Sequence, residues 1–349
     1  MVPPDFGGML KVLISSIHIF WAAGSCAPRP FIIKSKLMFN IGVDIGGQSA
    51  KCGIVDTEGQ ILSRVVIRTN DTEDPSVFIG ALASVLKRLV EETKSEGLIK
   101  GIGVGAPDAN YISGCIENAT NLTWGKGKVE FASLLSESMG IPVYMTNDAN
   151  AAAMGEMMYG AARGMKDFIM ITLGTGVGSG IVTDGKLLLG HDGLAGELGL
   201  TVAVPGGRTS SCGNLGCLEA YTSASGVAQT AREWLSESDE PSLLRDKERI
   251  SSLDVYEAAL QGDGLAARVF DFTGEILGRS LANFAAFSSP EAIFLFGGLA
   301  EAGDLIYRPV FKSMNENLPS IWKNRIKLLF SQLNQSDAAI LGAAALVEN

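Results

Sequence analysis

Apolar residues recur along the chain at two spacings, one typical of helices and one typical of strands. In residues 77–92 they lie three or four positions apart, which predicts an amphipathic helix. Residues 99–104 form a short apolar run that predicts a buried strand. The same patterns predict further strands at 141–145, 169–172, 292–296 and 326–330, and further helices at 150–160, 263–287 and 338–347. Strands therefore alternate with helices, which is typical of an α/β fold with two lobes.

One strand–turn–strand unit occurs twice. Its first copy covers residues 44–62 and its second covers 172–188, and in both a glycine-rich turn is followed by the tripeptide Gly-Ile-Val. Each copy then reaches a second turn that contains a glycine, Gly59 or Gly185. This pattern predicts a duplicated β-hairpin. Two such hairpins facing each other would place two glycine turns across a cleft.

Composition narrows the chemistry. The chain has 42 glycines among 349 residues, well above the usual share of about 7%, as close backbone approaches to a phosphate require. His18 and His191 are its two histidines, so a histidine metal site or a Ser-His-Asp triad is not expected, and acid–base work falls to carboxylates. Five cysteines in so long a chain do not suggest a disulfide framework, which favours a reducing, cytoplasmic compartment.

Charge and the first 37 residues bear on possible partners. A net charge of −10 without a basic block argues against nucleic acid. The apolar run 12–24 after Lys11 is too short to span a bilayer, so no membrane partner is expected. It fits either the core of a signal peptide or an extension upstream of a true start at Met38, and a need for a cytoplasmic nucleotide favours the extension. We expect residues 1–37 to lie outside the fold.

Glycine turns and isolated carboxylates carry the candidate chemistry. The turns at 46–47 and 174–178 and the pair 297–298 can offer backbone N–H groups to phosphate oxygens, although any one of them alone is usually only a turn. Asp148 lies where a strand gives way to a helix, so it is either an N-cap or a catalytic carboxylate. Glu197 lies between glycines, where packing does not explain a carboxylate, so it is either a solvated charge on a loop or a functional group.

These motifs, taken in order, resemble the sugar kinases of the ROK family (repressor, open reading frame, kinase). The resemblance runs from about Met38 to the C-terminus. It implies a two-lobed α/β fold of the ribonuclease H-like, actin-like ATPase class with duplicated β-hairpin phosphate loops. The motifs that carry it are Asp44-Ile-Gly-Gly, Asn121-Leu-Thr-Trp, Asn147-Asp-Ala-Asn, Leu173-Gly-Thr-Gly-Val-Gly, Ala195-Gly-Glu-Leu-Gly, Cys212-Gly-Asn-Leu-Gly-Cys-Leu-Glu and Gly297-Gly298.

The resemblance also implies an activity and a site. It implies ATP-dependent phosphorylation of a sugar hydroxyl with Mg²⁺, by a homodimer whose small lobe is 38–150 with 336–349 and whose large lobe is 151–335. Asp148 would be the general base, and Asp44 would help to place Mg²⁺ and the transferred phosphoryl group. The nucleotide and phosphate contacts would be Gly46, Gly47, Ser49, Lys51, Gly174, Thr175, Gly176, Gly297 and Gly298. The sugar contacts would be Asn121, Asn147, Asp148, Glu197 and Glu219.

Two departures from the family pattern lie near the expected phosphate and sugar sites. A threonine usually follows Asp-Ile-Gly-Gly in the family, whereas this chain has Gln48, so Ser49 would supply the hydroxyl one place later. The family often has Ala-Pro-Gly in the next loop, and this chain has Asp108 in place of that glycine. An aspartate there would reshape the rim of the sugar site.

The third departure concerns zinc. The family's usual set is one histidine and three cysteines, and the corresponding positions here hold Leu200, Ser210, Cys212 and Cys217. Two thiolates do not complete a tetrahedral site, so we predict no structural zinc, with Cys212 and Cys217 as a remnant. His191 is the remaining histidine that could substitute. The lost histidine also contacts sugar in the family, so the identity of the sugar stays open.

The sequence is also compatible with two other functions. The family's regulators resemble this fold with an added DNA-binding helix-turn-helix domain, and residues 1–37 are too short and too apolar for one. A sugar-binding protein without catalysis is the other alternative, against which the retained Asp44 and Asp148 argue.

Overall fold

The computed structural model describes residues 38–348, and the predictions for residues 1–37 lie outside this range. Two five-stranded sheets form its centre, with the same strand order and the same mixture of antiparallel and parallel pairs. The first sheet has the order β3-β2-β1-β4-β8 and the second has the order β11-β10-β9-β12-β13. The duplication predicted from the repeated hairpin therefore extends to whole sheets.

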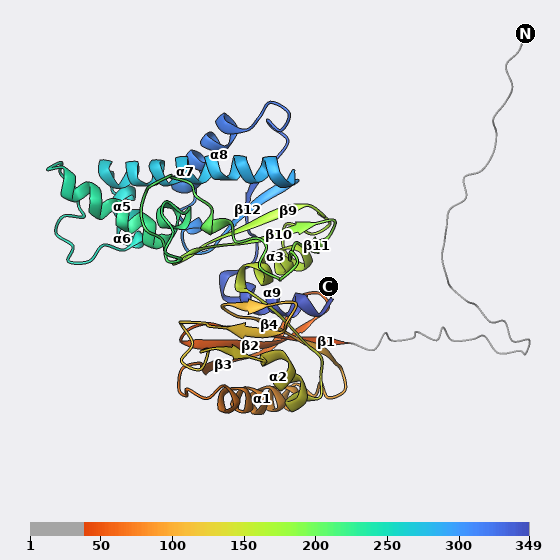
Figure 1. Ribbon diagram of the computed structural model, residues 1–349. Coiled ribbons are helices and arrows are strands. Elements are labelled where there is room, and N and C mark those ends of the chain that lie inside the picture. The colour runs from red at the N-terminus through yellow and green to blue at the C-terminus, as the bar shows by residue number, and fades with distance from the viewer. Residues whose placement is uncertain (1–37, 349) are drawn as a thin grey trace, which may run out of the picture. The chain divides into compact units, whose positions relative to one another are not determined.

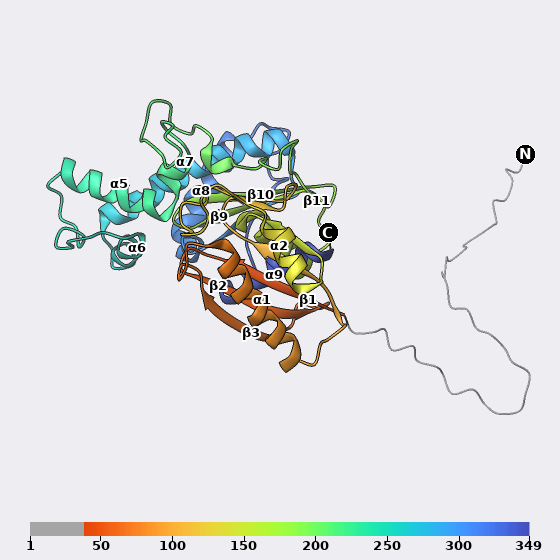
Figure 2. The same cartoon turned by 60° about the horizontal axis from the view of Figure 1, so that its bottom comes forward.

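The first sheet carries helices on both faces. Its strands are β1 (Phe39–Ile45), β2 (Ser49–Asp56), β3 (Ile61–Arg68), β4 (Ile99–Gly105) and β8 (Val143–Thr146). Helices α1 (Pro75–Glu92) and α2 (Phe131–Met139) lie on one face and α9 (Gln335–Ala345) lies on the other (Figure 1; Figure 2). A small sheet of β5 (Ala109–Asn110), β6 (Cys115–Glu117) and β7 (Lys128–Val129) follows β4.

The second sheet supports the larger helical layer. Its strands are β9 (Phe168–Leu173), β10 (Val177–Thr183), β11 (Lys186–Leu187), β12 (Ala292–Phe296) and β13 (Lys327–Phe330). Its core packs against α5 (Ala224–Glu237), α6 (Ser252–Leu260), α7 (Gly264–Ser288) and α8 (Asp304–Asn317). The short α4 (Glu219–Thr222) leads into α5. None of the helices described is long and apolar enough to cross a membrane.

Helices α3 (Asp148–Tyr159) and α9 pack against each other between the two sheets (Figure 1). Glycines make this close packing possible. A Cβ atom on Gly42 would lie 2.0 Å from the carbonyl oxygen of Ile340, and one on Gly103 would lie 1.7 Å from that of Ala343. Similarly, a Cβ on Gly342 would lie 2.5 Å from the carbonyl oxygen of Ala151. Both helices are therefore fixed to the strands that end in the cleft.

The strands and helices predicted from apolar spacing are confirmed, but no prediction was made for the helices α2, α5, α6 and α8. The strands predicted at 99–104, 141–145, 169–172, 292–296 and 326–330 and the helices at 77–92, 150–160, 263–287 and 338–347 correspond to observed elements, with small differences at their ends. No prediction was made for α8, which has Pro309 in its interior, where proline normally interrupts a helix. The short α2 was missed as well, because its serines break the apolar pattern.

Candidate functional site

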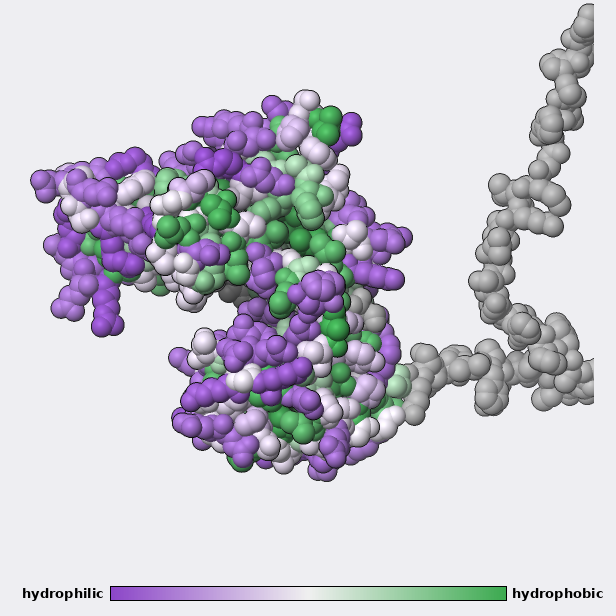
Figure 3. Space-filling model, in the orientation of Figure 1, coloured by the Kyte–Doolittle hydropathy of each residue, from purple (hydrophilic) through white to green (hydrophobic). Residues whose placement is uncertain are grey.

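Two cavities open into the hollow between the two sheets (Figure 3). The first, which we call the glycine cavity, has a volume of about 580 Å³. The second, which we call the carboxylate cavity, has a volume of about 850 Å³. The residues that line both are Asn121, Asp148, Gly176, Gly178 and Glu219. A molecule in one cavity would therefore meet a molecule in the other beside the Asp148 carboxylate.

Backbone forms much of the wall of the glycine cavity. The turn between β9 and β10 contributes Gly174, Thr175 and Gly176, and the N–H of Gly174 donates to the carbonyl of Gly176 over 3.0 Å. Gly297 follows β12 with a φ of +100°, and a Cβ there would lie 2.6 Å from the carbonyl oxygen of Leu173. Only glycine fits that position without strain. Phe296, Thr172, Ala338 and Ala339 complete this part of the wall.

Asp44 brings a carboxylate into the glycine cavity at the end of β1. It lies opposite Lys51 of β2 in the strand register. Burial, and then the charge of Asp148, raise the pKa of Asp44 to about 6, while Lys51 acts in the opposite direction. Asp44 and Asp148 thus line the same cavity, and Lys51 compensates their negative charge only in part. This donor set fits Mg²⁺, which binds one or two carboxylates together with substrate phosphates.

Asp148 is the first residue of α3 but it is not the N-cap. Asn147 is the N-cap, since its side chain accepts a hydrogen bond from the N–H of Asn150 over 2.8 Å. Asp148 instead accepts from the N–H of Ala149 over 2.8 Å and borders both cavities, where solvent can reach it. The protein packed around it raises its pKa. The N-cap interpretation is therefore wrong, and Asp148 is available to a bound molecule.

Side chains dominate the wall of the carboxylate cavity. Six acidic residues line it, and no lysine, arginine or histidine does so among residues 38–348. Glu197 is held near Asn147, whose amide nitrogen lies 3.4 Å from the Glu197 carboxylate. The pKa of Glu197 is raised, mainly by burial and then by Asp148 and Asp108. The six acidic residues are Asp108, Glu117, Asp148, Asp192, Glu197 and Glu219.

Two structural anchors hold the loops that carry these groups. Trp124 is buried against Phe78, with ring centroids 4.7 Å apart, and its indole N–H donates to the carbonyl of Thr69 over 2.9 Å, which fixes the loop of Asn121. Asn70 donates to the carbonyls of Gly47 and Asn121 and so links that loop to the β1–β2 turn. Sequence reasoning missed Asn70, because an asparagine outside any motif gave no signal.

The cysteine loop reaches the site through Glu219. The backbone N–H of Ser211 donates to the Glu219 carboxylate over 3.3 Å. The Cys212 and Cys217 sulfurs are 3.7 Å apart, and the Ser210 hydroxyl lies 3.0 Å from Cys212. The described residues contain no group of three or more metal-ligating side chains. Two sulfurs and one hydroxyl do not fit a zinc ion.

The structure brings most of the expected site residues together. Asp44, Asn121, Asn147, Asp148, Gly174, Thr175, Gly176, Glu197, Glu219 and Gly297 line one cavity or both. The structure does not place Gly46, Gly47, Ser49, Lys51 and Gly298 in either wall. Among these, Gly47 contacts the Asn121 loop, since a Cβ there would lie 3.2 Å from the Asn121 carbonyl oxygen, and Lys51 faces Asp44. Asp108 and Asn110 line the carboxylate cavity but were not expected as ligands.

Two similar mixed sheets, a glycine turn and a cleft between them define a protein of the actin-like ATPase fold class. The sequence model of the ROK family matches residues 40–349, and this chain belongs to that family. A glucokinase of Halalkalibacterium halodurans is 39% identical over 77% of this chain and 83% of its own length.

Solved structures and a regulator extend the comparison. A ROK family glucokinase from Streptomyces griseus, solved in complex with glucose and AMPPNP, is 33% identical, with a TM-score of 0.71 over 88% of this chain and 98% of that one. A xylose repressor from Caldicellulosiruptor bescii is 26% identical over 88% of this chain but only 77% of its own length. The family thus includes proteins named as kinases and proteins named as repressors.

Proposed function

We propose that this protein is an ATP-dependent sugar kinase that phosphorylates a hydroxyl of glucose or of a related hexose or N-acylhexosamine. One observation carries this proposal: Asp148 borders both cavities, where a sugar hydroxyl and a terminal phosphate can meet. The likeness to a glucokinase solved with glucose and an ATP analogue supports the assignment of one cavity to each ligand.

In this proposal the glycine cavity holds the nucleotide. The N–H groups of the 174–176 turn donate to phosphate oxygens, and Gly297, with Gly298 beside it, leaves room for the nucleoside. Phosphoryl transfer depends mainly on positioning and on compensation of the developing charge, which preorganised backbone donors supply. Gly46, Gly47, Ser49 and Lys51 lie outside the wall, so their phosphate contacts require movement of the β1–β2 turn.

In the carboxylate cavity Asn147, Glu197, Asn121 and Glu219 accept and donate hydrogen bonds to sugar hydroxyls. Asp148 takes the proton from the hydroxyl that attacks the phosphate. Its raised pKa brings a carboxylate nearer to neutral pH, where it becomes a more effective base. The ionised form does this work, so we expect activity to fall in acid.

Mg²⁺ is part of the proposal. Asp44 would hold it at the glycine cavity together with the phosphates of the nucleotide, where it would neutralise phosphate charge. The lobes 38–150 with 336–349 and 151–335 would close on sugar and exclude water. A homodimer in the cytoplasm is expected from the family resemblance, and light scattering on the purified protein tests the dimer.

Sugar-dependent formation of ADP tests the proposal. Purified protein is supplied with ATP and Mg²⁺ and with glucose, mannose, N-acetylmannosamine or no sugar, and ADP is measured. ADP formed only with sugar supports a kinase. No ADP with any sugar, combined with sugar-dependent DNA binding, would favour the regulator, and sugar binding without either result would favour a non-catalytic binding protein.

A further inference from the structure

Asp108 occupies an unusual backbone position at the edge of the carboxylate cavity. It follows β4 through Ala106 and Pro107 and has a φ of +52°, in the left-handed region that glycine favours. Aspartate adopts this region more readily than most residues with a side chain, and here it adds a carboxylate to the cavity wall. Residues held in such conformations cluster at functional sites.

The loop that carries Asp108 is fixed to the opposite wall. The Asn110 side chain donates to the carbonyl of Asp192 over 2.6 Å, and its oxygen accepts from the N–H of Ile112 over 2.9 Å. Gly193 allows this approach, since a Cβ there would lie 2.7 Å from the Asn110 side-chain oxygen. The backbone position of Asp108 relative to the cavity is therefore well determined by its neighbours.

Charge at this cavity is one-sided. No basic side chain among residues 38–348 lines the wall. At its rim, Glu117 pairs with Lys128 at 3.7 Å and Asp192 lies 3.8 Å from the His191 ring. Within that range, Asp108, Asp148, Glu197 and Glu219 form no such pair. Burial, and then the charge of Asp148, raise the pKa of Asp108, and Asp108 in turn contributes to the raised pKa of Glu197. A neutral sugar leaves this repulsion in place. A sugar that carries an ammonium group relieves it, and a sugar that carries a carboxylate or phosphate increases it.

We propose that Asp108 is a specificity-determining residue that gives the sugar site a preference for hexoses with a free, protonated amino group. The inference rests on the proposed kinase function and names a substrate class within it. Asp108 neither moves the proton nor touches the transferred phosphoryl group. Asp108 lies in the wall of the cavity attributed to the sugar, so it acts on sugar binding.

The experiment compares D-glucosamine, N-acetyl-D-glucosamine and D-glucose as substrates of the wild type and of Asp108→Asn. Asparagine tolerates a positive φ and has nearly the same shape, so this variant removes charge with little change in the backbone. We expect the ratio of kcat/KM for glucosamine to kcat/KM for glucose to fall about tenfold, because the KM for glucosamine rises more than the KM for glucose. A tenfold change corresponds to about 1.4 kcal/mol.

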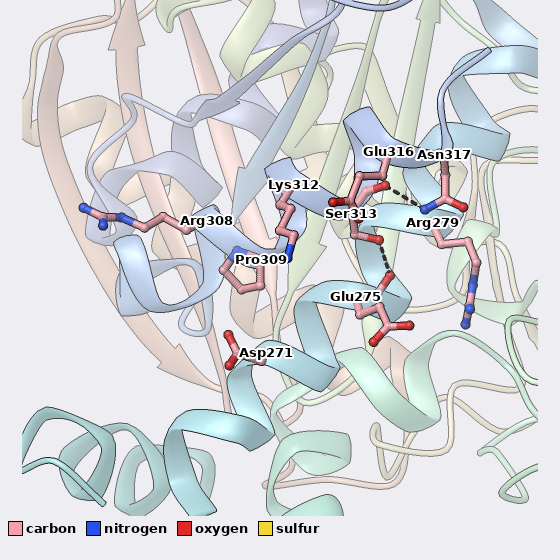
Figure 4. Close-up of a pocket in the computed structure, with 9 residues that line it drawn as sticks. All are labelled: Asp271, Glu275, Arg279, Arg308, Pro309, Lys312, Ser313, Glu316 and Asn317. Atoms are coloured by element: carbon pink, nitrogen blue, oxygen red, sulfur yellow. Dashed lines mark hydrogen bonds between the residues drawn. The ribbon is translucent and has the colours of Figure 1, made fainter. Parts of the chain in front are cut away.

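Asp271→Asn is the matched control. Asp271 lies on α7, in the groove between α7 and α8 that Arg308 and Lys312 also line (Figure 4). The same change of charge there should leave the glucosamine-to-glucose ratio unchanged. If both variants lower the ratio equally, the effect comes from net charge, and the inference is wrong.

Two further results separate this inference from the proposed function. If glucose is phosphorylated but Asp108→Asn leaves the ratio unchanged, or wild type prefers N-acetylglucosamine to glucosamine, the inference fails and the kinase function stands. If no sugar gives ADP, titration of glucosamine and glucose into the protein decides. Glucosamine binding that does not weaken relative to glucose in Asp108→Asn overturns the inference on its own.

Discussion

The glycine cavity and the carboxylate cavity adjoin each other but are built from different parts of the chain. The glycine cavity takes much of its wall from backbone, at the β9–β10 turn and after β12, elements of the duplicated sheet pattern. The carboxylate cavity takes more of its wall from side chains, beside the small sheet that occurs once among the described residues, at 107–118, and on the loop 192–197. The cavity attributed to the common substrate, ATP, therefore lies in the repeated part of the fold. The cavity attributed to the variable substrate lies largely beside the small sheet and the loop 192–197.

Asp148 is shared by both cavities, so its replacement gives the largest expected effect. Asp148→Asn keeps the side-chain shape but removes the base, and we expect kcat to fall by about 10²–10⁴-fold. The KM for glucose should stay within about threefold, because the other sugar ligands remain. Steady-state kinetics measure both values, with Asp271→Asn as the control. A variant that retains most of its kcat would show that Asp148 is not the base.

Replacement of Gly297 tests whether the glycine cavity binds the nucleotide, without changing the carboxylate cavity. An alanine there meets the Leu173 carbonyl oxygen at 2.6 Å with a positive φ, so Gly297→Ala should lower the free energy of unfolding by about 1–3 kcal/mol. The KM for ATP should rise more than the KM for sugar. Denaturant unfolding and kinetics check this. Gly80→Ala is the control, because its Cβ meets open space in α1, and an unchanged KM for ATP in Gly297→Ala would contradict the assignment.

Asp44 gives a pH-dependent effect on stability of about the same size. Its pKa is raised from 3.8 to about 6 in the folded protein, so the folded state holds its proton longer than the unfolded state as pH rises. Asp44 therefore lowers the free energy of unfolding progressively between about pH 4 and 6, by about 2–3 kcal/mol at neutral pH.

Asp44→Asn should remove this dependence and raise the midpoint of thermal unfolding at pH 7 while reducing kinase activity. Melting curves from pH 4 to 7, recorded with a chelator and without nucleotide, measure the difference between variant and wild type. A difference that stays constant over this range would show that the Asp44 pKa is not raised.

The smallest expected effect lies in the cysteine loop. Cys212→Ser should change kcat/KM for glucose by less than about twofold, because two thiols and a serine do not form a zinc site. Elemental analysis of protein purified without chelator should find no stoichiometric zinc. One zinc per chain, lost together with activity in Cys212→Ser, would contradict this prediction.

Prediction from the sequence succeeded where a motif fixed backbone geometry. The glycine turns at 174–176 and 297 and the junction at Asp148 stand out locally, because the chain needs small residues or a helix start there. The predicted strands and helices were recognised because their apolar residues recur at regular spacing. Helix α8 was not predicted because proline normally interrupts a helix. Pro309 nevertheless lies inside α8, where it packs closely against Gly274 of α7.

The positions of the loops around the carboxylate cavity could not be predicted from local sequence patterns. Asp108 was noticed only as a departure from a family pattern, and its proximity to Asp148 and Glu197 depends on how distant segments pack. Asn70 and Asn110 hold their loops through single hydrogen bonds to remote backbone, which no local spacing encodes. Ser49 of the first hairpin was expected to contact the phosphates, but it lies outside the walls of both cavities.

Following the phosphoryl group itself tests most directly whether sugar and nucleotide meet at Asp148. Protein in excess over ATP labelled on its terminal phosphate is mixed with glucose and Mg²⁺ and quenched within a single turnover. We predict that the label appears on the sugar in equal amount to ADP, and that Asp148→Asn loses this transfer. Label released as inorganic phosphate, or left on ATP for every sugar tried, would contradict the claim that the two cavities bring sugar and nucleotide together at Asp148.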